Sequence, residues 1–120
     1  MRRVKHYGGT EAGLYIVNGG LGTAVVTRSV VRLDGEVLGE WNYQTYLLLS
    51  DSLPVSPKAY SLRSGALMLA GQSNWLLTLE EFIDGQHDWF WDLITRRLVI
   101  EIFYDSVYGG ENFSVTPPAI

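Results

Sequence analysis

The sequence predicts an all-β fold, an antiparallel sandwich or barrel of about six or seven short strands with one or two short helices in the connections. Short runs rich in valine, isoleucine, leucine and aromatic residues alternate with glycine, proline and aspartate turn signals. The pattern lacks the regular helices between successive strands that a parallel sheet needs. With 120 residues, 47% of them hydrophobic and 18% charged, the chain suits one domain around one core.

The first two strands are predicted on either side of a glycine-rich stretch. Residues 11–18 alternate, with Leu14 and Ile16 on one face, which is typical of a half-buried strand. Residues 24–33 are rich in valine, whose branched β-carbon favours a pleated surface. The Asp-Gly pair at 34–35 then predicts a two-residue hairpin turn, because both residue types tolerate positive φ.

The middle of the chain predicts a helix, a loop and two further strands. Residues 41–49 (WNYQTYLLL) fit neither the helical nor the strand period, and we interpret them as a short helix closed by residues 50–51. Two prolines place residues 53–57 in a loop. Residues 66–70 and 74–79 are expected as strands on either side of a glycine turn.

The last third predicts one short helix and two strands. Trp89 and Leu93 lie on one side of a helix expected over residues 86–97. Residues 98–104 (LVIEIFY) are the clearest strand pattern in the chain. A turn with two glycines leads to a final strand over residues 111–115, which a Thr-Pro-Pro sequence ends.

One domain is expected over residues 1–120, with residues 1–8 and 116–120 as tails. The formal net charge is −4, from 13 acidic and 9 basic residues, and three of the basic residues lie within positions 2–5. Binding to nucleic acid needs a basic face that releases counterions from phosphates. The rest of the chain has no basic run, so we expect no nucleic-acid partner.

The composition also bears on redox chemistry and membranes. The chain has no cysteine, which excludes a disulfide framework and thiolate chemistry. No apolar run approaches the roughly 20 residues that span a bilayer, and the N-terminal Arg-Arg pair is not followed by the apolar segment of a signal peptide. We expect no membrane insertion by these residues. An upstream anchor and the compartment, cytoplasm or bacterial envelope, are left open.

The glycine-rich residues 17–26 (VNGGLGTAVV) resemble a phosphate-binding loop at first sight. A dinucleotide fingerprint needs a helix directly after the glycines, with its N-terminus facing the pyrophosphate. Here the glycines are followed by Val25, Val26 and Thr27, which favour a strand, and no P-loop lysine follows. We therefore predict an architectural role for these glycines, at a bend or bulge. No cofactor is expected.

Three stretches carry a resemblance to known domains. The Asn-x-Gly-x-Gly-x-Ala pattern of residues 18–24, the LMLAGQSNWLL sequence of residues 67–77 and the closing hairpin of residues 100–115 resemble bacterial immunoglobulin-like β-sandwich domains of unassigned function. The resemblance covers about two thirds of the chain. Thr23 stands where the pattern of those domains has proline, and the anchor helix that many of them carry upstream is absent here.

This resemblance implies an immunoglobulin-like antiparallel β-sandwich of about seven strands. It also implies a binding or structural module, in many cases on the outer side of a bacterial membrane, and it supplies no catalytic residues to carry over. A monomer or a weak dimer is expected.

The densest polar group favours a solvated acidic edge over a metal site. It consists of Glu80, Glu81, Asp84, His87, Asp88 and Asp92. Carboxylates can bind calcium, and a histidine with carboxylates can bind a transition metal. The spacing lacks the alternating ligands of an EF-hand loop, and only one imidazole is present. No serine lies in a G-x-S-x-G turn, so we predict neither metal ligands nor catalytic residues.

Aromatic residues supply the candidate binding surface. In the Trp89-Phe90-Trp91 sequence, adjacent residues cannot share a face, so at least one large ring is expected on the solvent side. An exposed tryptophan can stack on a sugar or anchor a protein partner. The candidate surface is therefore His87, Asp88, Trp89 and Trp91. Tyr104, at the end of the clearest strand, is expected to be a packing residue.

Three functions follow as hypotheses. The first is a non-catalytic interaction module that binds another protein or forms the soluble ectodomain of a bacterial envelope protein. The second is a carbohydrate-binding module that uses exposed tryptophan and tyrosine rings. The third is a small metal-dependent protein or enzyme that uses residues 80–92.

Overall fold

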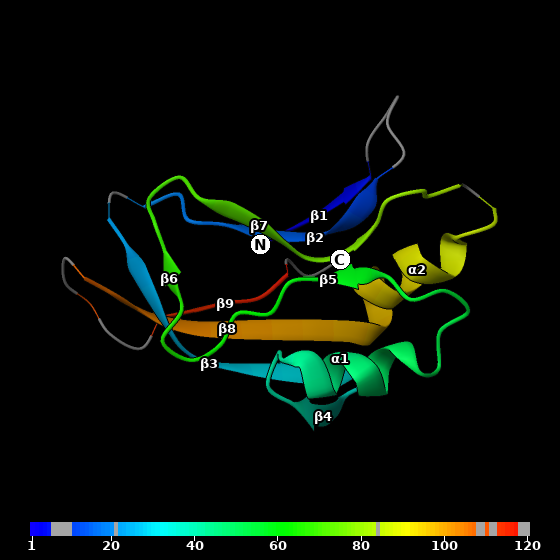
Figure 1. Cartoon of the computed structure of the whole chain (residues 1–120), viewed down its shortest axis with the longest axis horizontal. Coiled ribbons are helices and arrows are strands. Elements are labelled where there is room, and N and C mark those ends of the chain that lie inside the picture. Colours follow the sequence, from blue (N-terminus) through cyan, green and yellow to red (C-terminus); the bar gives the residue numbers. More distant parts are fainter. Residues whose placement is uncertain (6–10, 21, 84, 108–109, 111–112, 118–120) are drawn as a thin grey trace.

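A computed structural model describes residues 1–5, 11–20, 22–83, 85–107, 110 and 113–117, and it consists of two antiparallel sheets packed face to face (Figure 1). The described strands are β1 (Arg2–Lys5), β2 (Ala12–Val17), β3 (Ala24–Leu33), β4 (Glu36–Gly39), β5 (Lys58–Ala59), β6 (Leu67–Met68), β7 (Ser73–Leu79), β8 (Leu98–Ser106) and β9 (Phe113–Val115). The helical segments are α1 (Tyr43–Ser50), α2 (Asp88–Asp92) and a π-helical turn, η1 (Leu93–Arg97). The predicted all-β class with short helices in the connections is confirmed.

One sheet has the order β1-β2-β7-β5, and the other has the order β4-β3-β8-β9 with β6 also paired to β3. The nine described strands exceed the expected seven because short edge strands were not predicted. The expectation that residues 1–8 form a tail is wrong for residues 2–5, which pair with β2. The Arg-Arg-Val-Lys sequence of β1 has no apolar alternation. Backbone pairing adds it to the sheet edge, and Nε of Arg3 donates a hydrogen bond to the carbonyl of Ile94 at 2.8 Å. At the other end, residues 116–117 lie outside any strand, and residues 118–120 are outside the described part.

Several predicted elements appear with shifted ends. The helix expected over 41–49 is α1, and the strand expected over 66–70 is reduced to the two residues of β6. The helix expected over 86–97 is divided between α2 and the wider turn η1. The final strand starts at Phe113 within the described residues. No helix in the described ranges is long and apolar enough to cross a membrane.

The predicted hairpin turn is present between β3 and β4. Asp34 and Gly35 both have positive φ, 52° and 86°, as a two-residue turn of this kind requires. The Asp34 carboxylate accepts two hydrogen bonds from Arg97, Nε to Oδ1 at 3.0 Å and Nη2 to Oδ2 at 2.9 Å. This exposed pair joins the turn to the end of η1.

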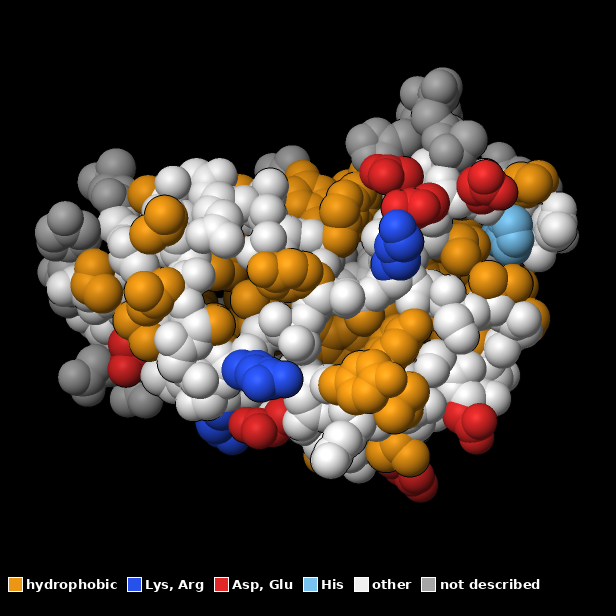
Figure 2. Space-filling model, in the orientation of Figure 1, with side chains coloured by type: hydrophobic (Ala, Val, Ile, Leu, Met, Phe, Trp, Pro, Cys, Tyr) orange, Lys and Arg blue, Asp and Glu red, His pale blue; other side chains and the backbone are white. Residues whose placement is uncertain are grey.

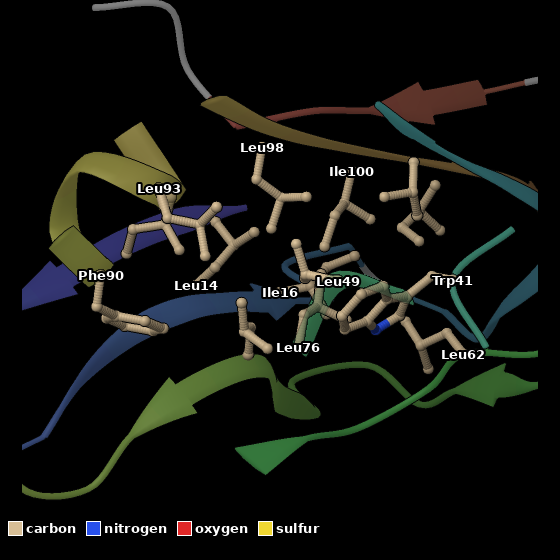
Figure 3. Close-up of a cluster of buried hydrophobic side chains, with 14 of the residues drawn as sticks. Leu14, Ile16, Trp41, Leu49, Leu62, Leu76, Phe90, Leu93, Leu98 and Ile100 are labelled. Carbon is tan, nitrogen blue, oxygen red and sulfur yellow. The ribbon is translucent and has the colours of Figure 1, made fainter. Parts of the chain in front are cut away.

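The core lies between the two sheets and is closed at one side by α1 and α2 (Figures 1 and 3). The buried side chains labelled in Figure 3 are Leu14, Ile16, Trp41, Leu49, Leu62, Leu76, Phe90, Leu93, Leu98 and Ile100. Between β2 and β7 the register shifts: Leu14 pairs with Leu77 but Tyr15 pairs with Trp75. Leu76 is therefore a bulge residue, and it is buried together with its neighbour Leu77.

Trp41 fixes α1 to both sheets. Its backbone N–H donates to the hydroxyl of Ser29 on β3 at 2.7 Å, and its indole N–H donates to the carbonyl of Tyr60 at 2.8 Å. The helix begins after Asn42, whose side-chain oxygen accepts a hydrogen bond from the backbone N–H of Thr45 at 2.9 Å. Leu49 on the inner side of the helix is fully buried.

Replacing Gly13 with alanine is expected to destabilise the protein. A β-carbon at this position would collide with backbone atoms of Leu77 and Thr78 on the neighbouring strand, and these atoms cannot move without disturbing the sheet. We expect Gly13→Ala to lower the free energy of unfolding by about 1–3 kcal/mol, as measured by urea denaturation. The control is Gly19→Ala, where a β-carbon would meet nothing within 4 Å. Equal effects of the two substitutions would contradict the close approach at Gly13.

The Asp34–Arg97 pair is expected to make stability depend on pH. The hydrogen bonds from Arg97 lower the pKa of Asp34 below its ordinary value. A lowered carboxyl pKa in the folded state stabilises the protein above the unfolded-state pKa, and this contribution is lost as the pH falls through the folded-state pKa. Asparagine tolerates the same positive φ as aspartate, so Asp34→Asn should keep the turn and still be less stable than wild type at neutral pH. In urea denaturation the difference should shrink on acidification and with added salt. A stability difference between wild type and Asp34→Asn that does not change with pH would contradict a stabilising role of the Asp34–Arg97 pair.

Candidate functional site

We call His87, Asp88, Trp89 and Trp91, at the start of α2, the α2 corner. The two polar side chains among them, His87 and Asp88, accept hydrogen bonds from the backbone that precedes the helix. Nδ1 of His87 accepts a hydrogen bond from the backbone N–H of Ile83 at 2.9 Å. The carboxylate of Asp88 accepts one from the backbone N–H of Gly85 at 3.0 Å. Both side chains therefore close the turn that leads into the helix.

The two predicted tryptophans pack against the core. Trp89 and Trp91 are half-buried, and Phe90 between them is fully buried. The rings of Phe82, His87, Trp89 and Phe90 follow one another at centroid distances of 6.1, 6.5 and 5.9 Å. The structure brings His87 and Trp89 into ring contact but leaves neither tryptophan as an open, flat platform. Phe90 on α2 is buried in the core, so the neighbouring rings of Trp89 and Trp91 also pack against the core.

The acidic residues nearby form ion pairs. Oε1 of Glu80, the residue after β7, lies 2.7 Å from Nζ of Lys58. The hydrogen bond to this carboxylate raises the pKa of Lys58. Asp92 lies 3.6 Å from Nε of Arg96, one helical turn away. Asp84 lies outside the described residues. Among the residues that the structure does describe, no group of three or more histidine, aspartate or glutamate side chains is placed to bind a metal ion.

The outer side of α1 is unusually apolar. Tyr43, Leu47 and Leu48 are 64%, 46% and 65% exposed, while Thr45 and Leu49 face the core. A surface helix ordinarily presents polar residues to water. Here the helix is apolar on two sides, which explains why its sequence fitted neither period. The run of three leucines was the available signal, and sequence reasoning did not recognise a second, uncovered face.

We call Tyr43, Leu47 and Leu48 the α1 surface. Figure 2 shows hydrophobic side chains gathered on this side of the molecule, over the region that α1 occupies in Figure 1. The ring of Tyr43 stacks on that of Tyr46 at 6.3 Å with an interplanar angle of 29°. The hydroxyl of Tyr46 donates to the carbonyl of Pro57. Tyr43 is therefore an exposed ring supported by a fixed neighbour.

Two clefts border the α1 surface at Tyr43. One has a volume of about 520 Å³ and is partly polar, with Glu40 and Arg63 in its wall. The other, of about 300 Å³, extends past Tyr46 to Lys58. Trp41 lies in the wall of both clefts, so their shape is set by the same hydrogen bonds that position α1.

The glycine-rich stretch is followed by strand β3, as predicted, and no helix N-terminus is present there among the described residues. Asn18 organises the stretch. Its side-chain amide donates to the carbonyls of Gly22 at 2.9 Å and Met68 at 2.8 Å, and its side-chain oxygen accepts from the backbone N–H of Gly20 at 3.0 Å. These contacts join the loop after β2 to β6 in the other sheet.

Comparison of the chain with known protein families, with curated proteins and with solved structures finds no match.

Proposed function

We propose that the chain is a non-catalytic β-sandwich module that binds another protein through the α1 surface. One observation carries this proposal: the eight-residue helix α1 leaves three large apolar side chains exposed on its outer side while its inner side is buried in the core. Contiguous exposed apolar side chains mark interaction sites on proteins that are otherwise soluble.

The geometry suits a protein partner in energetic terms. Full burial of a leucine side chain contributes about 1.5–3 kcal/mol, and a few central side chains carry most of the binding energy of an interface. Tyr43 loses little conformational freedom on binding because its ring already stacks on Tyr46. The proposed interface therefore has an aromatic anchor at Tyr43 beside two leucines.

The proposed interface differs from the surface predicted at His87 and Asp88, whose side chains accept hydrogen bonds from the local backbone. One further point supports a binding role. The resemblance to bacterial immunoglobulin-like domains implies a binding or structural module, and we propose the same class here. The soluble ectodomain of an envelope protein is the setting that this resemblance favours.

Carbohydrate binding is the second candidate, and Tyr43 favours it. The exposed ring stands beside a cleft whose wall includes Glu40, Asn42, Gln44 and Arg63, a combination of stacking and hydrogen-bonding groups that suits a sugar. Binding of this kind would be lost in Tyr43→Ala and retained in Leu48→Lys on a glycan array. A protein interface would be weakened by both substitutions.

The test of the protein-binding proposal compares three immobilised proteins. Wild type, Leu48→Lys and the control Leu69→Lys are exposed to the same cell extract, and retained proteins are quantified by mass spectrometry. Leu69 is 59% exposed and lies in the turn after β6, away from α1, so it matches Leu48 in exposure but not in place. A lysine near the C-terminal end of α1 is compatible with the helix dipole. Because Leu48 and Leu69 are both largely exposed, both variants should fold.

We expect a partner retained by wild type and Leu69→Lys to be reduced at least tenfold on Leu48→Lys. The same retained set on all three proteins would exclude the α1 surface as the interface. Light scattering completes the test: self-association of wild type that Leu48→Lys abolishes would show that the surface binds a second copy, which contradicts a different protein as the partner.

A further inference from the structure

The loop that joins β2 to β3 lies at the end of the sandwich opposite α2 (Figure 1). A cavity of about 320 Å³ lies beside this loop. Aliphatic side chains from both sheets form its wall, among them Ile16 on β2, Val26 on β3 and Ile102 on β8. Hydrophobic side chains and a hollow are visible in the same part of the molecule in Figure 2. The cavity is separate from the α1 surface and has no part in the function proposed above.

Small residues at one end of the wall leave part of the cavity unfilled. On β3 the residue at the cavity end is Ala24, and Val26 follows it along the wall. The loop that closes this end contributes Gly19, Gly20 and Gly22, which have no side chain to fill the space. The same glycines that lack the context of a nucleotide site therefore leave a void between the sheets.

The wall of the cavity is built in advance of any ligand. The three side-chain hydrogen bonds of Asn18 fix the glycine loop to Met68 on β6. Met68 is itself nearly buried and faces the cavity. A preformed wall of this kind favours binding because little ordering is needed when a ligand enters.

Aromatic rings and one available hydroxyl indicate the class of ligand. Tyr104 on β8 and Phe113 on β9 line the cavity with their rings stacked, 5.4 Å apart at an interplanar angle of 28°. Phe113 is 42% exposed, so the stack reaches the opening. The hydroxyl of Tyr104 makes no hydrogen bond to any of the described residues, and it is not sealed off from solvent. The packing role expected for Tyr104 thus leaves its polar end available.

We propose that this cavity binds a small aromatic compound with a single hydrogen-bonding group, such as a substituted phenol. An apolar cavity of about 150 Å³ is large enough for benzene, so a substituted ring or two fused rings fit in 320 Å³. The guest ring stacks against the Tyr104–Phe113 pair, as aromatic rings prefer in offset or edge-on arrangements. Its polar group forms a hydrogen bond with the hydroxyl of Tyr104.

The test follows the methyl group of Met68 by NMR in protein with ¹³C-labelled methionine methyl groups. The sequence has two methionines, and Met1 serves as the internal reference. The probes are p-cresol and 4-methylcyclohexanol, which carry the same substituents on an aromatic and a saturated ring. We expect p-cresol to shift the Met68 signal saturably and to bind about threefold to tenfold more tightly than 4-methylcyclohexanol, because only the aromatic ring stacks.

Two variants locate the ligand. Ala24→Phe fills the cavity and should abolish the p-cresol shift, while Val37→Phe on exposed β4 should leave it unchanged. Tyr104→Phe, which keeps the ring, should weaken p-cresol but not toluene and so tests the hydroxyl even where Ala24→Phe fails to fold. A Met68 signal that does not respond to millimolar p-cresol overturns the proposal. So does equal affinity for the two probes, since the site is then aliphatic. None of these outcomes bears on binding through the α1 surface.

Discussion

Nine residue pairs join β3 to β8, from Ala24 opposite Ser106 to Leu33 opposite Leu98. The register shifts once along this ladder, between Val26 and Arg28, so Thr27 is an extra residue on β3. A bulge of one residue reverses which side chains point into the core beyond it. Ala24 and Val26 face inward on one side of Thr27, and Ser29 and Val31 face inward on the other. Both proposed sites depend on this single shift.

Ser29 links the bulge to the α1 surface. Its inward hydroxyl accepts the backbone N–H of Trp41, and the indole of Trp41 reaches the carbonyl of Tyr60. This buried connection sets where α1 begins and which of its sides faces the core. Leu47 and Leu48 lie on the side of α1 that stays exposed when the helix is held in this position. At the other end of β3, the inward position of Ala24 leaves the cavity open.

Local sequence patterns were sufficient for the longer elements. The valine-rich β3, the Asp34-Gly35 turn and the clear pattern of β8 were all predicted, because alternation and positive-φ residues act within a few positions of the chain. The edge strands β1 and β5 were not predicted. β1 pairs with β2, the next strand in the chain, and β5 pairs with β7, but neither β1 nor β5 has the apolar alternation that marks a buried face.

The predicted binding surface at α2 was likewise only partly readable from the sequence. The residue types of the α2 corner indicated a binding surface, yet His87 and Trp89 are engaged in local packing, because the docking of Phe90 sets how far the neighbouring rings protrude. The sequence by itself determined the β class, the main strands and the turn at Asp34-Gly35, whereas the helix of residues 43–50 was an interpretation of a pattern that fitted neither period. Only the tertiary structure decided which apolar side chains stay uncovered and where the sheets leave a space. Exposure and cavities depend on segments that meet across the fold, and no pattern within one segment records what that segment will face.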